Sequence, residues 1–161
     1  DMIQKLQDED ALPTQLYLST NAADYESFIK INKPKYDDSW ERWNRTLDML
    51  KNLDTRTVLR ITLIRDYNDQ KDMIPAFADM FRKASPHFIE IKSYMHIGRS
   101  TNRLEHENML EMHEVKKFSE EIAKQSKIFS IMDESLVSRI SILQNNERFI
   151  DRWIPTYSHT N

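Results

Sequence analysis

A chain of 161 residues with a formal net charge of −3 is the size of one domain, and this charge gives no overall preference for nucleic acid. It contains no cysteine, which excludes disulfides, zinc–thiolate sites, thiol nucleophiles and iron–sulfur clusters held by this chain. Its single glycine, Gly98, excludes a Gly-rich phosphate loop of the Rossmann or P-loop type. No apolar run reaches the roughly 20 residues of a membrane span, so we expect a soluble, cytoplasmic protein with no membrane partner.

The hydrophobic pattern alternates between strands and helices along most of the chain. Such alternation is typical of a parallel sheet with outer helices in one α/β domain. The predicted elements in chain order are a strand at 15–19, a helix at 23–31 capped by Asn21 or Asp24, a helix from 37–39 through Leu50, a strand at 57–64, a helix at 71–84, a strand at 88–95, a helix at 112–126, strands at 128–131 and 139–143, a turn at Asn145–Asn146 and a helix at 147–153.

The strand at 57–64 carries two polar residues, Arg60 and Thr62, on the same face. Inside a closed barrel this face would be the lumen, and Arg60 would need an anion or a hydrogen-bonding ligand to offset its desolvation. On an open sheet, Arg60 would extend to water. The sequence leaves both alternatives open.

The segment from Phe88 to Glu114 is the most informative part of the chain. Its strand leads into a loop rich in hydrogen-bond donors, and polar groups just past a strand end build sites in open sheets and barrels. The loop suits a phosphate or a nucleobase edge, and it is equally consistent with an ordinary solvated connection. Its donors are Arg99, Ser100, Thr101, Asn102 and Arg103.

Lys92 is the candidate catalytic residue of this segment. It lies in a strand beside Ile89, Ile91 and Tyr94, where desolvation of its amine would suit Schiff-base or phosphate chemistry. The alternative is an ion pair with Glu90.

Other constellations favour structural roles. His106 and His113 share a helical face with glutamates but lack the spacing of a zincin helix, so we predict no metal site. Trp40 and Trp43 could stack nucleobases, but their helical spacing favours core packing.

Three βα units followed by two short strands make about half of a barrel. No strand is predicted before residue 15, so the strand at 15–19 should form an unpaired edge of the sheet.

Four segments carry a resemblance to a known family, and they are TQLYLS (14–19), WERWNRTLDMLKNLDTRTVLRITLIRDYN (40–68), FIEIKSYMHIGRSTNRLEHENM (88–109) and DESLVSRISIL (133–143). They resemble the tRNA 4-demethylwyosine synthases, with the archaeal form most similar. The resemblance covers nearly the whole chain and implies the C-terminal part of a partial (βα)6 TIM-type barrel of a radical S-adenosylmethionine enzyme. It assigns residues 1–161 to the C-terminal half of one barrel domain, with the wyosine-base-formation region at about 36–110.

The resemblance also implies an activity. Enzymes of this family condense pyruvate with N1-methylguanosine of phenylalanine tRNA to give 4-demethylwyosine, using S-adenosylmethionine and two [4Fe–4S] clusters. The cluster cysteines belong to the N-terminal half, so we expect this cysteine-free chain to be inactive without that half. Its partners would be phenylalanine tRNA, pyruvate and the missing half of the barrel.

By analogy, strand-end residues would line the cofactor and substrate pocket, and basic residues near the barrel mouth would face tRNA. Two alternatives remain, a non-catalytic tRNA-binding module and half of another (βα) barrel enzyme; a Schiff-base enzyme using Lys92 is a weaker third. The expected cofactor-binding residues are Ser19, Thr20, Asn21, Arg60, Thr62, Asn68, Tyr94 and Met95, and the expected tRNA-binding residues are Lys33, Lys35, Arg99, Asn102 and Arg103.

Overall fold

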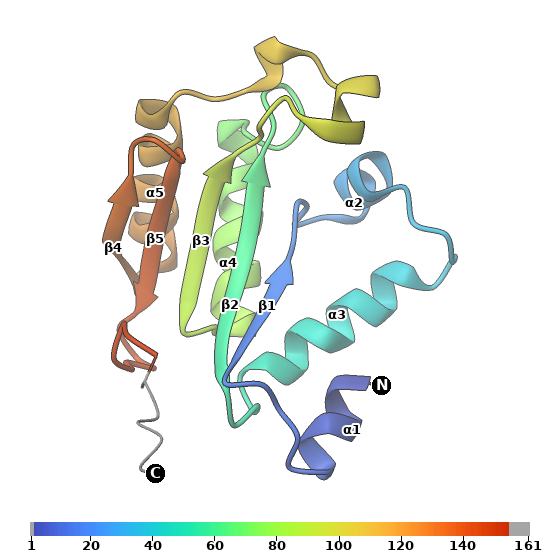
Figure 1. Cartoon of the computed structure of the whole chain (residues 1–161), viewed down its shortest axis with the longest axis vertical. Helices are drawn as coiled ribbons and strands as arrows, with labels where there is room; N and C mark the ends of the chain where they lie inside the picture. The colour runs from blue at the N-terminus through green and yellow to red at the C-terminus, as the bar shows by residue number, and fades with distance from the viewer. Residues whose placement is uncertain (1, 155–161) are drawn as a thin grey trace, which may run out of the picture.

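The computed structural model describes residues 2–154, which form one five-stranded sheet with its helices (Figure 1). The helices are α1 (Met2–Asp8), α2 (Tyr25–Asn32), α3 (Ser39–Leu50), α4 (Ile74–Ala84) and α5 (Met112–Ser126), and the short 3₁₀ helices are η1 (Lys71–Met73), η2 (Gly98–Asn102) and η3 (His106–Asn108). The strands are β1 (Gln15–Ser19), β2 (Arg56–Leu63), β3 (Phe88–Ser93), β4 (Phe129–Ser135) and β5 (Ile140–Asn145).

The sheet has the strand order β1-β2-β3-β5-β4 and is mixed. The first three strands are parallel, as predicted, whereas β5 runs antiparallel to both β3 and β4. A four-residue turn joins β4 to β5, and a connection this short permits only an antiparallel pair. The prediction of parallel strands is therefore correct for β1, β2 and β3 and does not extend to β4 and β5.

One face of the sheet packs on helices. Leu59, Ile61 and Leu63 of β2 are fully buried in a core shared with α3, α4 and α5, and Figure 1 shows α4 and α5 behind the strands. The alternating positions Arg60 and Thr62 are only partly buried on the opposite face. Arg60 and Thr62 therefore share one face of β2, as the sequence predicted.

Most predicted boundaries agree with the structure. The strand at 15–19 and the helix at 112–126 match β1 and α5, and the predicted helix at 71–84 is η1 followed by α4. Helix α2 begins at Tyr25, not Ala23, because the Asp24 carboxylate caps it by accepting a hydrogen bond from the Ser27 amide at 2.9 Å. The two late strands are longer than predicted, and α1 was not predicted.

The predicted helix at 147–153 is wrong, since residues 146–154 are irregular. Side chains form hydrogen bonds with the backbone groups that would be paired with each other in a helix. The Asn145 amide oxygen accepts from the Glu147 and Arg148 amides, and the Arg56 guanidinium donates to the carbonyls of residues 151, 152 and 153. These contacts fix the segment across the end of the sheet where β2 begins.

Within residues 2–154, no helix combines the length and the apolar character that crossing a membrane requires.

Candidate functional site

A cavity of ≈ 410 Å³ lies where β2 and β3 end, at the side of the sheet that also carries α2 and the loop containing η2 (Figure 1). The carboxyl ends of parallel strands are the usual place for a site in α/β proteins. Its lining comes from β2 and β3, from the turn after β1, from α2 and from the η2 loop. The lining residues include Asn21, Thr62, Lys92, Tyr94, Met95, Lys30, Lys33, Tyr67, Ser100 and Arg103.

The cavity brings together a large part of the predicted site. Asn21, Thr62, Tyr94 and Met95 from the expected cofactor set line it, together with Lys92. The parallel register places Thr62 directly opposite Lys92 on the neighbouring strand. Two residues expected to face tRNA, Lys33 and Arg103, line the same cavity.

Asn68 and Thr20 are buried and do not line the cavity. The Asn68 side chain is fully buried and accepts from the Ile64 amide at 2.7 Å while donating to the Asn21 and Thr62 carbonyls, each at 2.9 Å. The Thr20 hydroxyl donates to the Ala22 carbonyl at 3.1 Å. Both satisfy backbone or side-chain polar groups where β1 and β2 end, as buried polar groups must be.

Asn21 has a double role at this edge. Its amide oxygen accepts from the Thr62 amide at 3.0 Å, so it ties the turn after β1 to β2 while lining the cavity. Ser19 lines a separate cavity between α2 and α3 and does not join this set.

Arg60 neither extends freely to water nor lacks a partner within the protein. Its Nε donates to Glu90 Oε1 at 2.7 Å, across the β2–β3 register, and its guanidinium lies 4.7 Å from the centre of the Tyr17 ring. Tyr17 also donates its hydroxyl hydrogen to Glu90 Oε2 at 3.1 Å. Burial, followed by the Glu90 charge, raises the pKa of Tyr17, and the hydrogen bond to Glu90 raises the pKa of Arg60.

This network shows whether Lys92 forms an ion pair with Glu90. Glu90 is engaged by Arg60 and Tyr17, so the ion pair between Lys92 and Glu90 is not formed. Lys92 is half-buried and lines a cavity whose other cationic residues are Lys30, Lys33 and Arg103. Among residues 2–154, no aspartate or glutamate lines this cavity. Its electrostatic character therefore favours an anionic ligand.

The remaining residues expected to face tRNA lie outside the cavity lining. Arg99 and Asn102 are exposed on η2, and Lys35 is exposed with its ammonium 5.5 Å from the centre of the Tyr36 ring. Arg99 and Asn102 belong to η2, and Lys35 belongs to the connection between α2 and α3.

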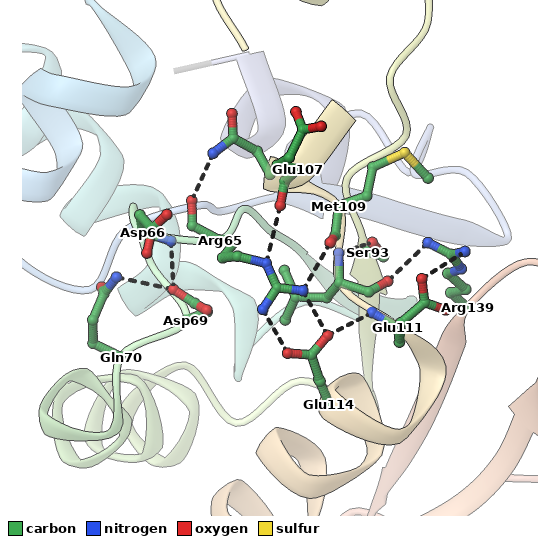
Figure 2. A network of polar contacts seen from close by, with 12 residues as sticks. Arg65, Asp66, Asp69, Gln70, Ser93, Glu107, Met109, Glu111, Glu114 and Arg139 are labelled. Atoms are coloured by element: carbon green, nitrogen blue, oxygen red, sulfur yellow. Dashed lines mark hydrogen bonds and ion pairs between the residues drawn. The ribbon is translucent and has the colours of Figure 1, made fainter. Parts of the chain in front are cut away.

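A polar network holds the loop that closes the cavity, and Figure 2 shows Arg65 at its centre. The Arg65 guanidinium makes two hydrogen bonds to Glu114, at 2.6 and 2.7 Å, and donates to the carbonyls of Glu107 and Met109, each at 3.0 Å. The hydrogen bond from Arg65 lowers the pKa of Glu114. Through these bonds the residue just after β2 anchors η3 and the start of α5.

Sequence reasoning missed Arg65, Lys30 and Tyr67. The only local signal for the Arg65 network was the capping-box pattern at Glu111 and Glu114, because Arg65 and Glu114 are 49 positions apart. Tyr94 has an additional partner, since its hydroxyl lies 3.1 Å from His96 Nδ1.

The chain's donor set does not fit an iron–sulfur cluster, because cysteine is absent from the whole sequence. In the part that the structure describes, no three or more histidine, aspartate or glutamate residues gather as metal ligands would.

Comparisons with known proteins identify the family of the chain. A family model described as wyosine base formation matches residues 83–145, which lie later in the chain than the range of about 36–110 expected for this region. The S-adenosyl-L-methionine-dependent tRNA 4-demethylwyosine synthase of Methanocaldococcus jannaschii is 41% identical over 153 residues, covering 94% of this chain and 45% of that protein.

Solved structures give the same result. A structure of TYW1 with a lysine–pyruvate adduct bound has a TM-score of 0.78 and 40% identity, covering 89% of this chain and 44% of that one. A crystal structure of archaeal TYW1 has a TM-score of 0.70 and 36% identity, with 90% and 45% coverage. The chain thus spans slightly less than half the length of these three proteins, and it belongs to the family of the tRNA 4-demethylwyosine synthases, as their C-terminal part.

Proposed function

We propose that this chain serves as the C-terminal part of a tRNA 4-demethylwyosine synthase, with its three parallel strands forming part of a partial (βα)6 barrel. The observation that carries the proposal is the basic cavity where β2 and β3 end, in a chain whose relatives carry that name. The proposed reaction condenses pyruvate with N1-methylguanosine of phenylalanine tRNA. The target base would have to leave its stack to reach the cavity.

The proposed cofactor is S-adenosylmethionine, which supplies the radical that starts the reaction when it is bound and reduced. The ligands of both [4Fe–4S] clusters would come from residues outside this chain. The cavity residues fit a polar ligand that carries a carboxylate. Thr62 and Asn21 offer hydrogen-bonding groups, and Lys92 offers a positive charge.

Lys92 is the proposed catalytic residue of this chain. We assign its ammonium to the carboxylate of pyruvate or of S-adenosylmethionine, because the cavity holds no competing acid. A related structure holds a lysine–pyruvate adduct, so the second chemistry open to this amine is attack on the pyruvate ketone.

Two variants separate these chemistries in the enzyme assembled from this chain and the rest of the synthase. Lys92→Arg keeps the charge but cannot form an imine, and Lys92→Ala loses both functions. If Lys92 pairs with a carboxylate, Lys92→Ala should lower kcat/KM by about tenfold to a hundredfold. Lys92→Arg should retain much of the activity that Lys92→Ala loses. Borohydride trapping with pyruvate followed by peptide mapping gives the second measurement. An adduct on Lys92 would replace the carboxylate assignment with the imine role.

The tRNA contacts outside the cavity are assigned to Lys35, Arg99 and Asn102. The exposure of all three residues, and the place of Arg99 and Asn102 beside the cavity-lining Ser100 and Arg103, support this assignment. Contacts of this kind position the nucleic acid without reading its sequence.

A further inference from the structure

A buried carboxylate lies next to the proposed catalytic amine without binding it. Glu90 is on the same face of β3 as Lys92, two positions before it, and side chains at this spacing are neighbours on a strand. A lysine side chain is long enough to reach a carboxylate over that distance. Among residues 2–154, however, Lys92 has neither an ion pair nor a side-chain hydrogen bond.

Two donors on neighbouring strands hold Glu90 instead. Arg60 donates from Nε to Oε1 at 2.7 Å and from its terminal nitrogen to Oε2 at 3.4 Å, and the Tyr17 hydroxyl donates to Oε2 at 3.1 Å. The Glu90 side chain is only 8% exposed, so water is a poor replacement for these donors. Arg60 itself does not line the cavity. Its connection to the cavity therefore runs through Glu90 and Lys92.

We propose that Arg60 is a positioning residue for Lys92, because it holds Glu90 and thereby keeps the Lys92 amine available to a ligand in the cavity. Without Arg60, the buried Glu90 charge would lose its cationic partner, which is a costly state. Pairing with Lys92 would remove that cost but would hold the amine as an ammonium against Glu90. This inference rests on the proposed function, since it explains how the proposed catalytic amine stays unpaired.

Two other cations near Glu90 are already bound to other groups. Arg56 and Arg152 line a small cavity together with Glu90. The Arg56 guanidinium donates to the carbonyls of residues 151, 152 and 153, and Arg152 forms an ion pair with Asp133. Each would have to leave these partners to reach Glu90, whereas Lys92 would leave none. Lys92 is therefore the cation that Glu90 would bind in the absence of Arg60.

The competing explanation is that Arg60, Glu90 and Tyr17 only fasten β1, β2 and β3 together. The two explanations predict opposite changes in the reactivity of Lys92 when Arg60 is removed. A loosened sheet would expose the Lys92 amine and speed its reaction with an electrophile. Pairing with Glu90 would slow that reaction, because a nearby negative charge favours the protonated amine, which is not a nucleophile.

The test is competitive labelling of lysines in this 161-residue chain with trace acetic anhydride at about pH 8, where lysine amines are mostly protonated. Peptide mapping gives the labelling rate of Lys92 relative to Lys127, which is exposed and has no ion pair among residues 2–154. Arg60→Gln should lower this ratio about threefold to tenfold. Arg60→Gln combined with Glu90→Gln should restore it to within about twofold of wild type.

Arg42→Gln is the matched control, because it breaks an exposed arginine–carboxylate pair with Asp38 on α3 and should leave the ratio unchanged. Circular dichroism confirms that each variant is folded. A ratio that is unchanged or raised in Arg60→Gln overturns the positioning role, and so does a fall that Glu90→Gln does not reverse.

Glu90→Gln alone keeps the proposal testable if Arg60→Gln does not fold. It should leave the Lys92 ratio within about twofold of wild type, whereas a rise of about tenfold would show that Glu90 already binds Lys92 and would overturn the proposal. These measurements need neither cofactor nor turnover. The proposed role of Lys92 in catalysis fails separately, if Lys92→Ala leaves kcat/KM of the assembled enzyme unchanged.

Discussion

At the scale of single residues, the register of the sheet determines which charges are neutralised. Arg60 and Glu90 are 30 positions apart but directly opposite on β2 and β3. Glu90 is therefore satisfied by Arg60 and Tyr17, and Lys92, two positions further along the same strand face, stays available. A one-residue shift in register would send these side chains to the core face.

His87 gives a prediction about pH. It precedes β3, its Nδ1 accepts from the Thr57 amide at 3.1 Å, and burial together with the charges of Arg148 and Arg56 lowers its pKa from 6.5 to about 4. Between pH 6.5 and pH 4, the imidazole of His87 binds a proton in the unfolded chain but stays neutral in the folded chain. The contribution of His87 to the free energy of unfolding is thus fully present above about pH 6.5. It is lost as the pH falls to about 4, and the total loss is at most about 3 kcal/mol.

Urea denaturation of wild type and His87→Asn across pH 4 to 7.5 measures this effect. Asparagine can still accept from the Thr57 amide but does not titrate in this range. The difference in unfolding free energy between the two proteins should narrow toward low pH. Parallel pH profiles would show that His87 does not cause the acid sensitivity.

At the scale of elements, the loop between β3 and α5 depends on Arg65. Its guanidinium reaches both the η3 segment and the first turn of α5, as Figure 2 shows. The loop includes η2 and contributes Ser100 and Arg103 to the cavity. Arg65 therefore acts on the site by holding its loop.

Arg65→Met should loosen this loop. The change leaves the Glu114 carboxylate and the carbonyls of Glu107 and Met109 without their donor, at a cost of about 1 kcal/mol for these partly exposed groups. Hydrogen exchange should rise at residues 103–111 more than in β2 or α4. Arg42→Met, which removes an exposed pair with Asp38, is the control and should change exchange little. Equal protection in wild type and Arg65→Met would rule out this anchoring role.

At the scale of the whole molecule, β1 and β4 are the two edges of the sheet in residues 2–154. The archaeal relatives are about twice as long as this chain. We expect their additional residues to pair with β1, because parallel strands would precede it in the proposed barrel and an open edge favours strand addition.

Adding the N-terminal part of a related synthase should therefore protect β1. Amide exchange at Gln15–Ser19 should slow at least about tenfold, as expected when an edge strand becomes internal. The opposite edge, β4, serves as the internal control. Slower exchange at β4 with no change at β1 would place the contact at the wrong edge and reject the prediction.

The sequence by itself determined the parallel strands β1, β2 and β3 and their helices, because hydrophobic periodicity and helix caps are local signals that survive without tertiary contacts. It also placed Lys92, Tyr94 and Thr62 near a site, since they lie at the ends of such strands. The tertiary structure alone decided that Glu90 pairs with Arg60, that α2 brings Lys30 and Lys33 to the same cavity, and that Arg56 holds residues 151–153 in an irregular conformation. Each of these depends on partners between about 30 and 100 positions apart, whose meeting is set by strand register and packing and leaves no mark in a local pattern.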